Sequence, residues 1–192
     1  MIYRLLKFLA TLILIIVRRW EVQGRENLPA GGGFLLVANH VSYWDPVVVV
    51  CAFKRKVYYM AKAELFNIPV LAYVLKISGV FPVQRDITDR AAIRTALRLL
   101  ADGQIVGIFP EGTRSHTGEL LKPHLGAAML AAKAKVPMIP VALIGTRGVF
   151  GRVKMIIGAP IANRESSKVS RSDLEKDSDL VMGQIASMMK KH

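Results

Sequence analysis

Short apolar runs of strand length alternate with helix-like segments along most of the chain, and this alternation limits the available folds most strongly. Five runs are bounded by Gly, Pro or charged residues, as buried strands are. They cover residues 34–38, 57–60, 105–109, 138–144 and 153–157. The pattern favours an α/β domain, with a mixed, largely parallel sheet flanked by helices.

Two helices are expected between these strands. The first covers residues 88–102, with Thr88 as its N-cap and Gly103 as its C-terminal stop. The second covers residues 125–135 and ends before Pro137, because the residue preceding a proline avoids the helical region.

The chain length of 192 residues suits one domain with one core. We expect three parts: a membrane-interface helix over residues 1–19, the main domain over 20–162, and a polar tail over 163–192. A weak helix from about residue 172 to 190 is expected in the tail. It either docks on the domain or remains loose.

The N-terminal segment is strongly apolar, but its uninterrupted stretch is shorter than the roughly 20 residues that a spanning helix needs. On a helix its polar side chains form one narrow stripe, made of Arg4, Lys7, Thr11 and Arg18. Such a helix can lie in a membrane interface with its cations among the headgroups. A helix docked on the protein core would need a narrower apolar face. A single tilted span stays open, with Arg18 and Arg19 holding the rest of the chain in the cytoplasm.

The net charge of +13 favours an anionic partner, either nucleic acid, an anionic membrane or a phosphorylated substrate. The hydrophobic share of 52% argues against a plain nucleic-acid binder, and the aromatic residues lie mostly in apolar runs. We therefore expect no nucleic-acid partner. The single cysteine, Cys51, excludes an internal disulfide.

A histidine and an aspartate follow the strand at 34–38. His40 stands at the carboxyl end of that strand, where open α/β folds usually bind ligands. A turn would let Asp45 fold back on the imidazole, fix its tautomer and leave the other ring nitrogen as a base. No nucleophilic side chain is marked by its surroundings, so the pair suits direct activation of a substrate hydroxyl. The alternative is a loop histidine that hydrogen-bonds to local backbone.

The segment FPEGTRS after the strand at 105–109 has the composition of an anion site. Gly112 permits an unusual backbone conformation, Thr113 can donate a hydrogen bond, and Arg114 carries a forked cation that matches phosphate. Glu111 either holds Arg114 or binds a substrate hydroxyl. The alternative is an ordinary glycine turn with a solvated arginine.

Two more cations, Lys62 and Arg85, follow apolar segments. Each alone is typical of a surface, but one rim of the sheet could gather three cations from three strand exits. The sequence has no Gly-rich nucleotide loop, and its His and Cys residues lack metal-ligand spacing. We therefore expect neither a metal ion nor a bound cofactor.

Together these blocks resemble the glycerolipid acyltransferase family, the bacterial lysophosphatidic acid acyltransferases in particular. NHVSYWD (39–45) is similar to the first motif of that family and GVFPVQR (79–85) to the second. FPEGTRS (109–115) is similar to the third and VPMIPVAL (136–143) to the fourth. Four blocks in the family's order make a chance match very improbable.

The resemblance implies a role for each site residue. His40 would remove the proton from the acceptor hydroxyl, while Asp45 would orient and stabilise the imidazole. The hydroxyl would attack the thioester of acyl-CoA or acyl-carrier protein, which are co-substrates. The acceptor and its phosphate would be held by Lys62, Arg85, Glu111, Gly112, Thr113 and Arg114. Asn39 and Pro140 would have structural roles or line the path of the acyl chain.

The expected reaction therefore converts lysophosphatidic acid to phosphatidic acid at the cytoplasmic face of the cell membrane. An alternative is the same chemistry on glycerol 3-phosphate, a lyso-ornithine lipid or another lysophospholipid. A further alternative, a basic membrane-binding protein without catalysis, leaves the His40–Asp45 pair without a purpose.

Overall fold

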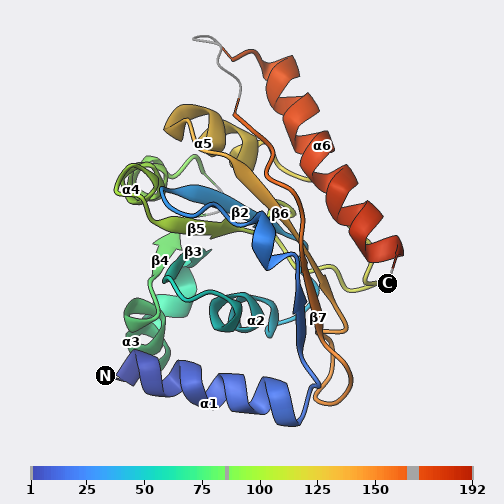
Figure 1. The fold of residues 1–192 in the computed structure, drawn as a ribbon. Coiled ribbons are helices and arrows are strands. Elements are labelled where there is room, and N and C mark those ends of the chain that lie inside the picture. Colours follow the sequence, from blue (N-terminus) through green and yellow to red (C-terminus); the bar gives the residue numbers. More distant parts are fainter. Residues whose placement is uncertain (1, 85–86, 164–168, 192) are drawn as a thin grey trace.

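A computed structural model describes residues 2–84, 87–163 and 169–191 of the protein (Figure 1). Its centre is a seven-stranded sheet with the order β1-β7-β6-β2-β5-β3-β4. The strands are β1 Glu21–Gln23, β2 Phe34–Ala38, β3 Val57–Lys62, β4 Val80–Val83, β5 Ile105–Ile108, β6 Met138–Ile144 and β7 Lys154–Ile157. Every pair is parallel except β6 with β7. The prediction of a mixed, largely parallel sheet flanked by helices is therefore confirmed.

Helices cover both faces of this sheet (Figure 1). They are α1 Ile2–Ile16, α2 Asp45–Ala52, α3 Pro69–Ile77, α4 Arg90–Ala101, α5 Gly126–Ala134 and α6 Arg171–Lys190. One core cluster joins α1 and α2 to the sheet, and the other joins α4, α5 and α6 to its opposite face. Side chains of β2 alternate between the two clusters, and all five are buried. A strand buried on both faces explains the unbroken apolar run.

The caps of α4 differ in part from the prediction. Asp89, and not Thr88, is its N-cap, because the Asp89 carboxylate accepts the N–H groups of Ala91 and Ala92 at 2.9 and 3.0 Å. The stop at Gly103 is confirmed, since this glycine has φ 74° and donates its N–H to the carbonyl of Leu100.

The C-terminal helix α6 is docked and not loose. It begins with a capping box in which Ser170 and Asp173 bond each other's backbone N–H groups. Val181, Met182 and Ile185 are buried in the core cluster shared with α4 and α5. The polar tail expected from the sequence therefore contributes one long element to the core.

Helix α1 turns its polar stripe toward the protein. Lys7 donates to the carbonyl of Phe53 at the end of α2, Thr11 donates to the carbonyl of Lys7 at 2.7 Å, and Arg18 is fully buried. The expectation that the stripe lies among headgroups is therefore wrong for these three residues, because the Lys7 and Arg18 cations are bound by protein carbonyls and the Thr11 hydroxyl bonds within its own helix. Only Arg4 of the stripe stays exposed.

The outward side of α1 is apolar. Its exposed residues are Ile2, Leu5, Leu6, Phe8, Leu9, Leu12, Ile13, Ile15 and Ile16, which we call the α1 arc. Within the described ranges, no helix has both the length and the apolar character needed to cross a bilayer.

Candidate active site

The first and third motifs meet because β2 and β5 are neighbouring parallel strands, with Val37 opposite Ile108. After β2 the chain enters α2 on one face of the sheet, whereas after β5 it reaches α5 on the other. Diverging connections of this kind leave a crevice at the carboxyl ends of the strands, where α/β folds bind ligands. His40 lies at this edge.

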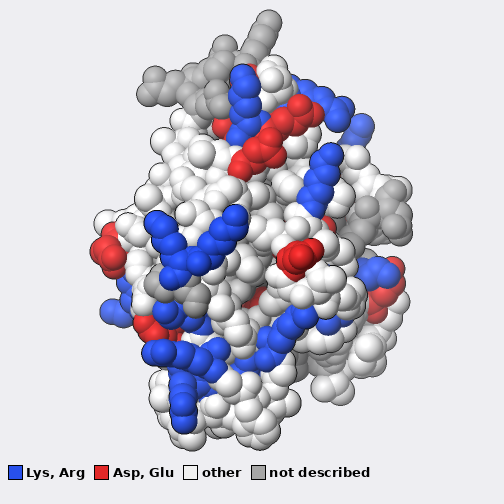
Figure 2. Space-filling view, turned by 90° about the vertical axis from the view of Figure 1, so that its right-hand side faces the viewer, with Lys and Arg blue, Asp and Glu red and all other residues white. Residues whose placement is uncertain are grey.

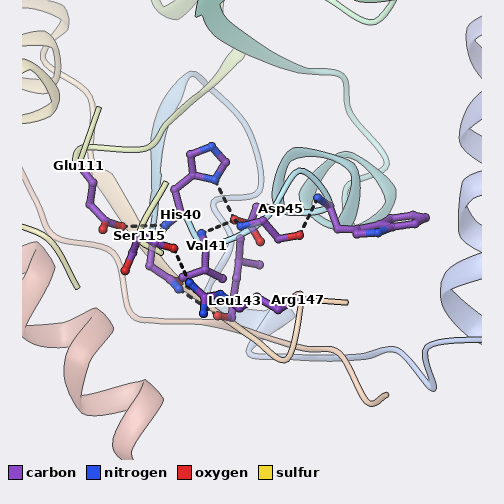
Figure 3. Close-up of polar contacts among 10 residues, drawn as sticks. His40, Val41, Asp45, Glu111, Ser115, Leu143 and Arg147 are labelled. Carbon is purple, nitrogen blue, oxygen red and sulfur yellow. Dashed lines mark hydrogen bonds and ion pairs between the residues drawn. The ribbon is translucent and has the colours of Figure 1, made fainter. Parts of the chain in front are cut away.

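Asp45 folds back on His40 (Figure 3). The Nδ1 atom of His40 lies 2.8 Å from Oδ2 of Asp45. The same oxygen accepts the backbone N–H groups of Val41 at 2.6 Å and Ser42 at 2.7 Å. Asp45 is fully buried, while the His40 side chain keeps 16% exposure. With its Nδ1–H donated to the carboxylate, the imidazole has Nε2 left as a proton acceptor.

Aromatic rings fix the face of the imidazole. The His40 ring stacks on Phe109 with centroids 4.1 Å apart, and Phe109 stacks on Tyr59 at 5.6 Å. Tyr59 fits here because Gly107 has no side chain, and an added Cβ would lie 2.3 Å from the Tyr59 ring. Burial, and then the charge of Asp45, raise the pKa of the Tyr59 phenol well above its usual value. The imidazole is thus held by Asp45 at one edge and by Phe109 on one face.

The third motif also holds the backbone of His40 (Figure 3). Glu111 accepts the His40 N–H at 2.7 Å through Oε1, and the Leu121 N–H at 2.9 Å through Oε2. The N–H of Ser115 donates to the carbonyl of His40 at 2.8 Å. Glu111 is buried, and burial raises the pKa of its carboxyl group. Each of its oxygens is occupied by backbone, so the geometry favours a positioning role over either role expected from the sequence.

Asn39 fastens the end of β2 to β6. Its amide donates to the carbonyl of Leu143 at 3.0 Å and accepts the N–H of Leu143 at 2.7 Å. Asn39 is fully buried. Both side-chain bonds go to one backbone residue, which makes Asn39 a structural residue of the site.

The segment of the chain that contains this site matches a known protein family. The model of the acyltransferase family matches residues 19–144, which contain every contact to His40 described above. This chain belongs to the acyltransferase family. The resemblance inferred from its four motifs is thereby confirmed.

Similar members of the acyltransferase family have related names. A 1-acyl-sn-glycerol-3-phosphate acyltransferase of Bacillus subtilis is 37% identical over 147 residues, which are 73% of this chain and 73% of that protein. One from Borreliella burgdorferi is 33% identical over 71% of this chain and 54% of its own length. The crystal structure of the 1-acyl-sn-glycerophosphate (LPA) acyltransferase PlsC from Thermotoga maritima superposes with a TM-score of 0.71 and 29% identity. That superposition covers 88% of this chain and 71% of the other.

The structure brings one predicted cation of the acyltransferase domain onto the His40 loop. The guanidinium of Arg114 lies 3.5 Å from the ring centroid of Tyr43 and donates to its hydroxyl at 2.8 Å. Tyr43 belongs to the segment between His40 and Asp45. Gly112 has φ 69°, the unusual conformation that the sequence suggested.

The other predicted residues are less closely joined to His40. Lys62 ends β3 and pairs with Glu64 at 3.0 Å, and Thr113 is exposed. Pro140 lies in β6 against Gly158 and near α6, on the opposite face of the sheet from α2. Its role in an acyl-chain path therefore stays a prediction. Arg85 lies outside the described residues.

Sequence reasoning missed Phe109, Tyr59 and Tyr43 as site residues. Tyr43 lies inside the first motif and Phe109 inside the third, and these positions could have indicated both residues. Tyr59 lies in a strand with ordinary apolar patterning and gave none. Its place depends on the absent side chain of Gly107 on the neighbouring strand, which spacing along one strand does not reveal.

Proposed function

We propose that this protein transfers a fatty acyl group from an acyl thioester to the sn-2 hydroxyl of 1-acyl-sn-glycerol 3-phosphate, forming phosphatidic acid in phospholipid biosynthesis. The observation that carries the proposal is the 2.8 Å contact between His40 and Asp45 at the carboxyl edge of β2. It occurs in a chain whose Bacillus subtilis and Thermotoga maritima relatives are named for this activity.

The proposed chemistry uses His40 twice. Its Nε2 takes the proton of the acceptor hydroxyl as the oxygen attacks the thioester carbonyl carbon. When the resulting tetrahedral intermediate collapses, the C–S bond breaks and the imidazolium returns the proton to the departing thiolate. Asp45 keeps the ring in the productive tautomer and stabilises the imidazolium. Acyl-CoA or acyl-carrier protein supplies the thioester.

The acceptor phosphate would be bound by cations beside this pair. Arg114 supports this role because Tyr43 holds its guanidinium on the loop that carries His40. A planar guanidinium can bind two phosphate oxygens at once. Lys62 and Arg85 would add charge, and Gly112 and Thr113 would shape the turn around the headgroup.

The membrane location is proposed from the α1 arc. The arc would lie among the acyl chains of the cytoplasmic leaflet, with Lys7, Thr11 and Arg18 against the protein and with Arg4 and Arg19 near lipid phosphates. Figure 1 shows α1 along the lower end of the molecule, and in Figure 2, which views that end from the C-terminal side of α1, the surface is mostly uncharged with Lys and Arg side chains above and across it. Nine large exposed apolar side chains on one helix go beyond the scattered apolar residues that are normal on soluble monomers.

A direct assay tests the proposed reaction. Purified protein is incubated with labelled acyl-CoA or acyl-carrier protein and with lysophosphatidic acid, glycerol 3-phosphate, lyso-ornithine lipid or another lysophospholipid. We expect labelled phosphatidic acid as the main product. A preferred product from another acceptor would move the activity to that substrate. Vesicle binding without any acyl transfer would identify a non-catalytic membrane protein.

A further inference from the structure

The loop between β6 and β7, residues 145–153, carries two large apolar side chains at its tip. Val149 is 63% exposed and Phe150 is 79% exposed. Gly148 and Gly151 flank them with φ of 74° and 112°, a conformation that other residues rarely adopt. Single exposed apolar residues are ordinary on protein surfaces. The exposure of Val149 and Phe150 therefore indicates a contact surface only in combination with α1, to which the loop is attached.

Arg18 attaches this loop to the C-terminal end of α1. Its guanidinium donates to four backbone carbonyls, those of Gly145 at 2.6 Å, Gly148 at 2.8 Å, Arg147 at 3.2 Å and Gly151 at 3.3 Å. The N–H of Val153 donates to the carbonyl of Arg18 at 2.9 Å. A fully buried cation must keep its hydrogen bonds, because an unpaired one is costly. The loop and the end of α1 therefore form one rigid unit.

The α1 arc continues onto the loop tip. Ile15 and Ile16 in the last turn of α1 are exposed, and Figure 1 places the loop beside that end of the helix. Arg147 and Arg152 flank the tip within the loop, and the Arg152 side chain, which pairs with Glu21 at 3.0 Å, stays 69% exposed. An apolar surface with a basic border is complementary to acyl chains beneath anionic headgroups.

We propose that the β6–β7 loop is a second bilayer contact, in which Val149 and Phe150 insert among the acyl chains beside α1. This inference rests on the membrane attachment of α1 proposed above. The loop lengthens the bilayer footprint beyond the last turn of α1. It keeps that end of the helix, and the sheet edge to which it is joined, close to the membrane surface.

The same loop is hydrogen-bonded to the active site (Figure 3). Arg147 donates to the carbonyl of Ser115 at 2.6 Å, and the N–H of Ser115 donates to the carbonyl of His40 at 2.8 Å. A short series of bonds therefore joins the bilayer contact to the backbone that carries the base. Insertion of the tip sets the distance of His40 from the membrane surface, where the lipid acceptor resides.

A fluorescent label at the tip tests this contact. Cys51→Ser removes the only cysteine, so Phe150→Cys in that full-length background takes a single nitrobenzoxadiazole label. The matched control is Leu180→Cys, which replaces a half-exposed leucine of α6 on the opposite face of the sheet from α1. Vesicles contain phosphatidylglycerol and phosphatidylethanolamine. We expect a blue shift and quenching by nitroxide-labelled lipid at position 150 and neither at position 180.

Two results would overturn the inference: identical behaviour of both labels, or a response at position 150 that depends on protein concentration without vesicles. The second result would mean that another copy of the chain covers the tip. In unlabelled protein, Val149→Ser with Phe150→Ser should weaken vesicle partitioning by about tenfold, while Leu180→Ser leaves it unchanged.

A Phe8→Ser, Leu12→Ser variant of the α1 arc separates the two proposals. If it loses vesicle binding and the loop variant does not, the loop contact alone is wrong. If both variants bind as the parent does, the attachment of α1 is wrong as well.

Discussion

Four groups from two segments, the first and the third motif, hold His40. Asp45 binds its Nδ1, Phe109 covers one ring face, Glu111 accepts its N–H, and the N–H of Ser115 binds its carbonyl. A proton acceptor works well only in a closely defined position. Loss of one of these contacts should therefore reduce turnover more than it weakens substrate binding.

Replacing the base tests its role most directly. His40→Ala should reduce kcat by about 10²–10⁴-fold while circular dichroism shows a folded protein. Asp45→Asn should approach the same loss for a specific reason. An Asn oxygen in the place of Oδ2 can still accept the three N–H groups, but it carries no negative charge to stabilise the imidazolium. Near-normal turnover in folded His40→Ala protein would falsify the mechanism.

Glu111 should act on turnover and not on acceptor affinity. Glu111→Gln places an NH₂ group against one of the two backbone N–H groups, which costs about 1–3 kcal/mol of stability. We expect a lower kcat with the KM for the acceptor unchanged, measured beside Glu119→Gln, an exposed change in the same segment. A rise in acceptor KM at constant kcat would show that Glu111 binds the substrate instead.

Arg114 should act on acceptor affinity. Arg114→Ala removes a charge-assisted hydrogen bond of roughly 1.5–3 kcal/mol, which corresponds to a KM for the lysolipid that is about 10–100-fold higher. The KM for the acyl donor should change far less, and Arg85→Ala should behave in the same way. Arg171→Ala on α6 is the control for a general loss of positive charge. Equal effects on donor and acceptor would indicate a structural role for Arg114.

At the scale of elements, burial on both faces made the central strands predictable. β2 and β6 have the expected bounds, and β3, β5 and β7 differ from theirs by one or two residues. The edge strands β1 and β4 were missed because neither has a fully buried residue to give it the pattern of a core strand, and β4 also contains a proline. Helix α2 was missed because its run of four valines favours a strand.

Only those contacts of the site that join residues close in the sequence were predictable. The five-residue interval from His40 to Asp45 suggested their contact, since one turn closes it. The bonds from Glu111 to His40 join segments 71 residues apart and depend on β2 and β5 being neighbours. The polar stripe of α1 was found, but its direction was not, because the partners of Lys7 and Arg18 are distant carbonyls.

The N-cap of α4 gives an element-scale test with a pH dependence. The N–H groups of Ala92, Gln84 and Ala91 bond the Asp89 carboxylate and lower its pKa from 3.8. Because the folded-state pKa is the lower one, this stabilisation is present above pH 3.8 and is lost as pH falls through the folded value. Asp89→Ala should lower the Tm at neutral pH, with a difference from the parent that shrinks in acid. Asp89→Asn also lacks the titrating carboxylate but keeps a capping side chain, so its difference from the parent should change with pH as much as that of Asp89→Ala and be smaller at every pH. A difference from the parent that does not change with pH would contradict this account.

At the scale of the whole molecule, the apolar surface and the reaction edge are joined through the β6–β7 loop. Arg18 binds that loop to α1, and Arg147 binds it to the third motif. The proposed membrane attachment and the orientation of His40 would therefore depend on one another. This account requires that Lys7 and Arg18 of α1 face the protein and that the α1 arc faces the membrane.

The two cations of α1 nearest the N-terminus give opposite predictions. Arg4 is exposed beside the α1 arc, so Arg4→Gln should weaken binding to anionic vesicles by about fivefold, close to 1 kcal/mol for one cation at the surface. Lys7 donates to the carbonyl of Phe53, so Lys7→Gln should lower the Tm and leave the dependence of binding on anionic lipid unchanged. Vesicle flotation at several phosphatidylglycerol fractions, with thermal melts of the same samples, measures both effects. The reverse pattern, in which Lys7→Gln weakens anionic binding and Arg4→Gln does not, would show that the polar stripe faces the lipid and that α1 lies on the membrane by its other side.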